Sequence, residues 1–139
     1  MLHIICAYRP NFPTGPLSVY WQHRSTLLER EDERCPRSAF LQDLGKFLTT
    51  ALQQGDHITL LMDGNTNMKQ SELQDTLGML GFKEAVLSRH GMLGPETFRR
   101  NKNRTLIDGI WVSQSLVIER SGYLDYDLVI PGGTIAAYG

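Results

Sequence analysis

Two short segments place polar residues beside apolar runs and are the best candidates for chemistry. Residues 63–65 (Asp-Gly-Asn) directly follow the apolar run 58–62, and Asp108 lies within the apolar segment 105–113. A carboxylate and an amide just past the carboxyl end of a central strand could hold a divalent cation or orient a water molecule. The alternative for residues 63–65 is a turn that favours these residue types for backbone reasons. Asp108 needs a partner, structural or functional, because burying an unpaired charge is costly.

A basic segment precedes Asp108, and a tyrosine ends the first apolar run. Residues 97–104 hold four cations and one aromatic residue, a combination that can bind phosphates and stack a base. A solvated hairpin tip is the alternative. Tyr8 is followed by Arg9 and Pro10, and a single tyrosine at such a position is also typical of packing at the edge of a core. The scattered histidines show no metal-binding spacing.

The apolar pattern predicts the elements that must position these residues. Apolar residues recur at three- and four-residue steps through 37–54, which predicts an amphipathic helix ended by Gly55. The segments 2–8 and 58–62 indicate strands, the second buried on both faces because nearly every position is apolar. This strand–helix–strand order implies neighbouring strands joined by a helical crossover.

Further elements are expected on the same grounds, and Cys6 is expected in the core. Helices are predicted from Ser18 through Leu28 and over 71–80. Strands are predicted over 82–87, 97–100, 105–113 and 116–120.

Composition excludes several classes of protein. The chain has 139 residues with a net charge of −1, 41% hydrophobic and 21% charged, which suits one globular domain and argues against disorder. No apolar stretch reaches the roughly 20 residues of a membrane span, so we expect no membrane contact. The balanced charge also excludes a wholly basic nucleic-acid binder. The two cysteines form no recognisable framework and no signal peptide is evident, so we expect a reducing compartment, cytoplasmic or nuclear.

In order and spacing, four segments resemble the endonuclease/exonuclease/phosphatase superfamily, and its retroelement (endonuclease–reverse-transcriptase-like) branch most closely. The segments are Ala7-Tyr8-Arg9-Pro10, Met62-Asp63-Gly64-Asn65, Thr97-Phe98-Arg99-Arg100 and the Thr-Leu-Ile-Asp-Gly-Ile-Trp-Val-Ser run at 105–113. The resemblance covers about residues 2–131. It implies an α/β fold that is half of an endonuclease/exonuclease/phosphatase-type sandwich, a mixed sheet with helices on one face, as a single truncated domain over residues 1–139.

The resemblance also implies Mg²⁺-dependent phosphodiester hydrolysis, with a role for each matching residue. Tyr8 would contact the scissile phosphate. Asp63 would position or deprotonate the attacking water or bind the metal, and Asn65 would steady water and phosphate and share the metal. Asp108 would orient a catalytic histidine. Flanking phosphates would be bound by Arg99, Arg100, Asn103 and Arg104.

Two parts of the superfamily pattern have no counterpart in this sequence. Superfamily members carry a metal-binding Glu upstream of the Tyr-x-Pro strand, and this sequence starts at Met1, just before that strand. They end in Ser-Asp-His, whereas Gly132, Gly133 and Thr134 follow the Ile-Pro pair here and no histidine comes after His90. We therefore expect a truncated nuclease-like domain that is weakly active or inactive alone, because a site lacking essential groups loses nearly all activity.

Half of a sandwich would leave one apolar sheet face open to water, and exposed apolar patches of that size are rare in soluble monomers. We therefore expect a homodimer formed through this face, with nucleic acid as a further, weakly bound partner. One alternative is an active Mg²⁺-dependent endonuclease completed by a partner chain or by the dimer. The other is a structural interaction module.

Overall fold

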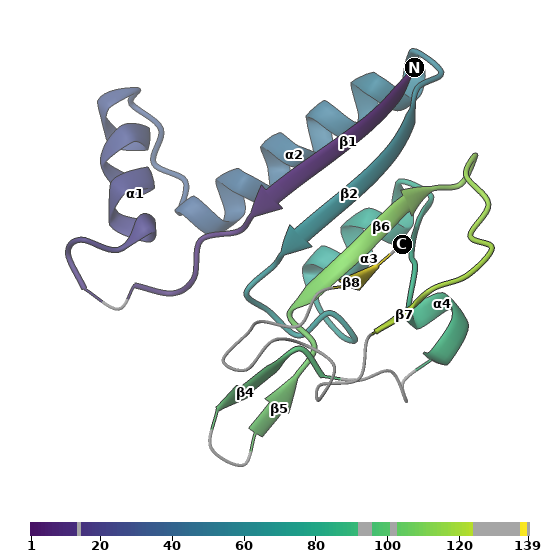
Figure 1. Ribbon diagram of the computed structural model, residues 1–139. Helices are drawn as coiled ribbons and strands as arrows, with labels where there is room; N and C mark the ends of the chain where they lie inside the picture. Colours follow the sequence, from purple (N-terminus) through teal and green to yellow (C-terminus); the bar gives the residue numbers. More distant parts are fainter. Residues whose placement is uncertain (14, 92–95, 101–102, 124–136, 139) are drawn as a thin grey trace.

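The computed structural model describes residues 1–13, 15–91, 96–100, 103–123 and 137–138. The chain is an α/β protein with a four-stranded mixed sheet in the order β1-β2-β6-β3 (Figure 1). The strands of this sheet are β1 (Leu2–Tyr8), β2 (His57–Asp63), β3 (Phe82–Glu84) and β6 (Asp108–Ser113). In the described residues the helices are α1 (Val19–Glu29), α2 (Pro36–Gln53), α3 (Glu72–Met79) and α4 (Leu87–His90). Separate two-stranded pairs are formed by β4 (Phe98–Arg100) with β5 (Asn103–Thr105), and by β7 (Gly122–Tyr123) with β8 (Ala137–Tyr138).

The sheet is mixed because β1 and β2 are parallel while β6 runs against both of its neighbours. Leu2 pairs with His57 and Tyr8 pairs with Asp63, so β1 and β2 end at the same edge. β6 is antiparallel to β2 and to β3, which places the start of β6 beside the ends of β1 and β2. The predicted strand–helix–strand crossover is confirmed, with α1 and α2 forming the connection.

The helix α2 is the amphipathic helix that the spacing predicted. Its N-cap is Cys35, whose Sγ accepts a hydrogen bond from the Ser38 N–H at 3.4 Å, and Pro36 occupies the first turn. Leu41 and Leu48 lie on its buried face. After the helix, Gly55 takes a φ of +79°, a conformation that side chains rarely adopt.

The core lies between one face of the sheet and the helices α2 and α3, which pass behind it in Figure 1. Along β2 the side chains alternate: Ile58 and Leu60 are fully buried, whereas Leu61 points to the other face and is half-buried. The prediction that residues 58–62 are buried on both faces is therefore wrong, because α2 and α3 cover only one face. Fully buried members of the core include Leu48, Ile58, Leu60, Met68, Leu73, Leu77 and Trp111.

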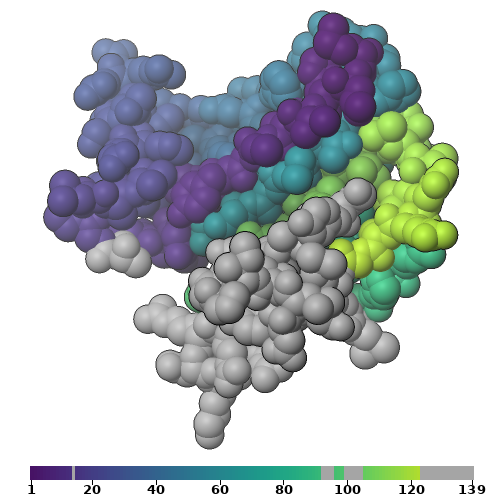
Figure 2. Space-filling view, viewed as in Figure 1, coloured from purple at the N-terminus to yellow at the C-terminus, as the bar shows by residue number. Residues whose placement is uncertain are grey.

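The opposite side of β1, which we call the outer face, carries Leu2, Ile4, Cys6 and Tyr8 and is open. Ile4 is 70% exposed, Leu2 is 56% exposed and Tyr8 is 46% exposed. The strand lies at the surface in Figure 2, in purple, with β2 in teal beside it. Cys6 is also exposed and not in the core as expected, because strand alternation turns it away from the helices.

The segment 105–113, predicted as one strand, is interrupted before Asp108. β5 ends at Thr105, and the next two carbonyl groups are used elsewhere: Leu106 O accepts the Met68 N–H (2.8 Å) and Ile107 O accepts the Gly64 N–H (2.9 Å). Asp108 is therefore the first residue of β6 and half-buried, where the sequence suggested a mid-strand position.

Two other predicted strands need correction. The strand predicted over 82–87 ends at Glu84, whose carboxylate accepts the N–H groups of Val86 and Leu87 and so begins α4. The segment 116–120 is not a strand, because the Leu116 N–H bonds to Ser113 O (2.9 Å) and the chain turns away after β6.

Other features of the sequence agree with the structure or fall outside it. Cys6 and Cys35 are both free, as expected. In the described part of the chain, no helix combines the length and hydropathy needed to cross a membrane. A basic turn is predicted over 101–104, of which 103–104 belong to β5 and 101–102 lie outside the described residues. The segment 130–134, with its Gly-Gly-Thr departure, also lies outside them.

We expect the same substitution to lower the free energy of unfolding more on the covered face of the sheet than on the outer face. We expect Ile58→Ala to lower the free energy of unfolding by about 2–5 kcal/mol, because it leaves a cavity in a fully buried site. Ile4→Ala should cost less than about 0.5 kcal/mol, because that side chain is largely in water. Urea denaturation at low protein concentration measures both, and equal losses would show that the outer face is covered.

Candidate active site

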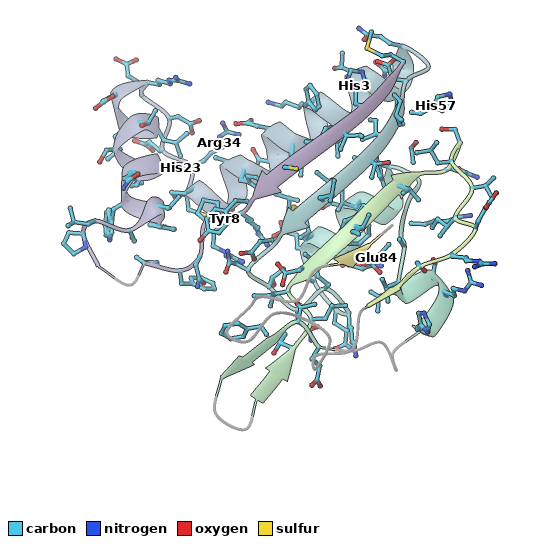
Figure 3. All side chains as sticks on the ribbon, viewed as in Figure 1. His3, Tyr8, His23, Arg34, His57 and Glu84 are labelled. Carbon is cyan, nitrogen blue, oxygen red and sulfur yellow. The ribbon has the colours of Figure 1, made fainter. Side chains whose placement is uncertain are left out.

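The sheet register brings Tyr8, Asp63 and Asp108 together at one edge. Tyr8 lies directly opposite Asp63 on the parallel pair, and Asp63 lies directly opposite Asp108 on the antiparallel pair. Residues directly opposite each other share a face of the sheet, so these residues form one row across three strands. The row lies on the side of the outer face, and Figure 3 shows Tyr8 at the carboxyl end of β1. Residues chosen separately from the sequence thus occupy one site.

The centre of the row is a pair of carboxylates. Directly opposite residues of antiparallel strands have Cα atoms about 4.5–5.5 Å apart, so Asp63 and Asp108 are close neighbours. Burial raises the pKa of Asp63, and the negative charge of Asp108 raises this pKa further. A hydrogen bond from the Asn65 N–H opposes both effects. Two carboxylates that repel each other in a half-buried position favour a shared cation.

The turn after β2 explains why Gly and Asn follow Asp63. The Asn65 N–H donates to Asp63 Oδ1 at 3.1 Å, and Asn65 has a φ of +46°, which asparagine tolerates better than most residues. A Cβ at Gly64 would overlap Met68 Cε and lie 2.8 Å from Leu73 Cδ2. The backbone explanation for residues 63–65 is therefore supported, and it holds Asp63 in the row.

The side chain of Asn65 joins the ends of β1 and β2. Its Nδ2 donates to the carbonyl oxygen of Arg9 at 2.8 Å, and the Arg9 N–H donates to Asp63 O at 2.9 Å. The amide nitrogen is thus used to hold the edge together, and Oδ1 is the atom that could face water or a metal. The metal-binding role of Asn65 remains a prediction.

Arg37 is a positioning residue that the sequence reasoning missed. Its Nη1 donates to Pro10 O at 2.6 Å and its Nη2 donates to Asn65 O at 3.3 Å, so one guanidinium group holds the loops after both β1 and β2. The Phe12 ring stacks on it, with Cζ 4.5 Å from the ring centroid. A signal was present, because a cation in the first turn of a helix opposes the helix dipole and implies another purpose.

Thr97 positions Asp108. Its hydroxyl oxygen accepts the N–H groups of Ile107 (3.0 Å) and Asp108 (3.1 Å), which joins the start of β6 to the segment before β4. The sequence contained Thr97 in the resembling motif, but nothing in the sequence indicated this contact.

The basic segment forms the hairpin β4–β5, beside the start of β6 (Figure 1). In its register Arg99 lies opposite Arg104, and Arg100 lies opposite Asn103. The four residues predicted to bind phosphates are therefore neighbours along this hairpin, and the hairpin joins the sheet at the edge that carries the row.

The histidines do not supply a partner for Asp108. In Figure 3, His3 and His57 lie at the far end of β1 and β2. His3 Nε2 is 2.8 Å from Asp56 Oδ2, and His57 Nδ1 is 2.7 Å from Ser115 Oγ. Within the described ranges, no group of three or more His, Cys, Asp or Glu side chains could hold a metal ion. The Asp63–Asp108 pair still suits Mg²⁺, which keeps several waters and is commonly held by one or two carboxylates.

Neither the known protein-family models nor the curated proteins give a match to this chain. The function must therefore be argued from the geometry of the sheet edge.

The raised pKa of Asp63 predicts that removing its charge increases the stability of the fold in a pH-dependent way. A carboxyl group whose pKa is raised by folding destabilises the fold once ionised, and this penalty grows as the pH rises from the usual 3.8 through the raised value. We expect Asp63→Asn, which keeps the oxygen that accepts the Asn65 N–H, to be more stable than the unsubstituted chain at neutral pH. The difference in stability should vanish at a pH well below the usual pKa of 3.8.

Urea denaturation at both pH values measures this difference, and Glu119→Gln serves as the control because Glu119 is exposed and distant in sequence. A lower stability of Asp63→Asn at neutral pH would contradict the electrostatic description of the row.

Proposed function

We propose that this chain is a truncated nuclease-like domain, half of an endonuclease/exonuclease/phosphatase-type sandwich, with its phosphodiester site at the Tyr8–Asp63–Asp108 row. One observation carries this proposal: the register that places Tyr8, Asp63 and Asp108 on one face at one sheet edge. Ligand sites of α/β sheets lie at the carboxyl ends of the strands, and this row lies at the carboxyl ends of β1 and β2, with the start of β6 beside them.

The chemistry follows from the groups in the row. Asp63 and Asp108, together with Asn65, would hold Mg²⁺, which when bound would neutralise phosphate charge and acidify a water. Asp63 would also position the attacking water through its carboxylate. The Tyr8 hydroxyl can donate to a phosphate oxygen.

We expect the isolated chain to be weakly active or inactive. In the described residues the hydrogen bonds of His3, His57 and His90 go to residues other than Asp108. The same residues hold no third acidic ligand for the cation. Catalytic groups act as a unit, so the loss of one removes most of the rate. A partner chain, or a second copy, that completed the site would make this an active Mg²⁺-dependent endonuclease.

The hairpin β4–β5 supports nucleic acid as the substrate class. The hairpin brings Arg99, Arg100 and Arg104 onto two paired strands next to the start of β6. Arginines gathered in this way can bind a polyanion, which gains from the release of counterions. We therefore propose that Arg99, Arg100, Asn103 and Arg104 bind phosphates flanking the row.

Metal binding tests the proposal independently of activity. We expect Mn²⁺, used as a paramagnetic substitute for Mg²⁺, to broaden the NMR signals of residues around Asp63 and Asp108. The double variant Asp63→Asn/Asp108→Asn should abolish this broadening, because it removes both carboxylates, whereas Glu119→Gln should retain it. Broadening that persists in the double variant would refute the site.

Nicking of supercoiled plasmid in the presence of Mg²⁺ then separates an active enzyme from an inactive one. Any cleavage that belongs to the chain must fall to background in Asp63→Ala.

A second candidate function, self-association as an interaction module, is favoured by the outer face of β1. Leu2, Ile4 and Tyr8 present a continuous apolar surface that α2 and α3 do not cover. We propose a second copy of this chain as the occupant, because the net charge of −1 leaves little repulsion between two copies. Because both cysteines are free, we also propose a cytoplasmic or nuclear location.

Analytical ultracentrifugation over a range of concentrations tests the self-association. We expect a dimer that Ile4→Asp converts to a monomer, because a charge at the centre of the outer face would be buried without a partner. Glu31→Lys, an exposed site beyond α1, is the matched charge-changing control. A stable monomer at every concentration would refute the proposal.

A further inference from the structure

Two guanidinium groups are buried together behind the sheet edge, on the side opposite the row. Arg9 follows Tyr8 in the chain and is 5% exposed, and Arg37, in the first turn of α2, is 8% exposed. Arginine is rarely buried unless its charge is paired. The hydrogen-bond and ion-pair partners of these two side chains therefore show whether their charges are balanced.

The positive charge of this pair is incompletely balanced. The Nη1 and Nη2 groups of Arg37 donate to neutral carbonyl groups, those of Pro10 and Asn65. Within the described residues, the ion pair of Arg9 is with Glu72, at a long 3.6 Å between Nη2 and Oε2, and the Glu72 side chain is 71% exposed. Arg9 Nε is buried and has no hydrogen-bond partner. A strongly polar donor that is more than nine-tenths buried thus lacks an acceptor.

The surroundings add further positive potential. The helices α2 and α3 both begin here, at Pro36 and Glu72, and a helix N-terminus carries a partial positive charge. Burial lowers the pKa of Arg9, and the positive charge of Arg37 lowers this pKa further. The pKa of Cys35 is lowered mainly by hydrogen bonds with Ser38, with a smaller contribution from Arg37. The two guanidinium charges and the helix N-termini favour an anion at this place.

We propose that Arg9 and Arg37 form a phosphate-binding site, in which Glu72 is an internal counter-ion that the incoming phosphate displaces. Arginine presents donors in a planar fork that matches phosphate oxygens, and Arg9 Nε is a donor left free for such a contact. Glu72 can leave easily because it is exposed and only weakly paired.

The site is joined directly to the row. The backbone of Arg9 bonds to Asp63 O and to the Asn65 side chain, and Arg37 bonds to Asn65 O. A phosphate held by the two arginines would therefore lie one residue from Tyr8, on the far side of the same edge. Its identity as a second phosphate of the same nucleic acid rests on the proposed function, whereas the binding of a phosphate group does not.

Glu72→Gln distinguishes a binding site from a purely structural pair of arginines. Removing an exposed carboxylate leaves the fold intact, yet it removes the counter-ion of Arg9 and leaves that guanidinium group to an external anion. We expect the affinity for inorganic phosphate, measured by calorimetry without divalent cations, to rise about fivefold, the upper range for an exposed ion pair. The double variant Arg9→Gln/Glu72→Gln should lose this gain.

Controls separate this site from other charges. Arg34→Gln removes an arginine that is already paired with Asp32 and Asp43, and it should leave phosphate affinity unchanged. Asp63→Asn should also retain phosphate binding, so failure of the row would not be mistaken for failure of this site. An unchanged phosphate affinity in Glu72→Gln would overturn the proposal.

A short single-stranded oligonucleotide, titrated in parallel, identifies the source of the phosphate. A matching gain in Glu72→Gln supports a phosphate of the nucleic-acid backbone, and a gain for inorganic phosphate alone supports the site as one for a small phosphate-bearing molecule.

Discussion

The hydrogen bonds of Arg37 hold together the edge on which the rest of the structure depends. β1 and β2 end side by side. In the loop after each strand, a backbone carbonyl group needs a hydrogen-bond donor. Arg37 supplies both donors, to Pro10 and to Asn65. Asn65 in turn bonds to Arg9, so the loops and the strand ends form one connected network. The positions of Tyr8 and Asp63 follow from that network.

This edge separates charge by sign. Carboxylates gather on the side of the outer face, where Asp63 and Asp108 are adjacent, and guanidinium groups gather on the helix-covered side, at Arg9 and Arg37. Strand alternation produces the separation, because consecutive residues such as Tyr8 and Arg9 point in opposite directions. On the helix-covered side, the described counter-ion is Glu72, which is exposed and weakly paired with Arg9. A metal–phosphate ligand would offer a cation to the carboxylates and an anion to the guanidinium groups.

Much of the architecture could be predicted from local patterns. The steps of apolar residues in α2, the run that forms β2 and the Gly and Asn after Asp63 all depend on neighbours in the chain. The proximity of Asp63 and Asp108 could not be predicted from such patterns, because it depends on β6 pairing with β2 across a long separation. The resemblance to a known superfamily implied a separate role for each residue, and the register shows that they are adjacent.

Other features could not be predicted from the sequence, because they depend on residues that are far apart in the chain. Leu61 is apolar and indicated a strand buried on both faces, but burial depends on which faces the helices cover. Arg37 contacts carbonyl groups from two distant loops, and only its unfavourable place in a helix marked it. Thr97 has no helix or strand of its own, so its contact with Asp108 is visible only in three dimensions.

The position of β1 also has a consequence for how the chain folds. β1 is synthesised before its partner in the sheet, β2, and the helices α1 and α2 lie between them in the chain. Parallel pairing across a long crossover is slow, because the loop must close before the contacts form. Until then a growing chain on the ribosome carries an apolar strand with both edges free. β1 is therefore the segment most exposed to mispairing between nascent chains and the natural target of chaperones that bind apolar strands.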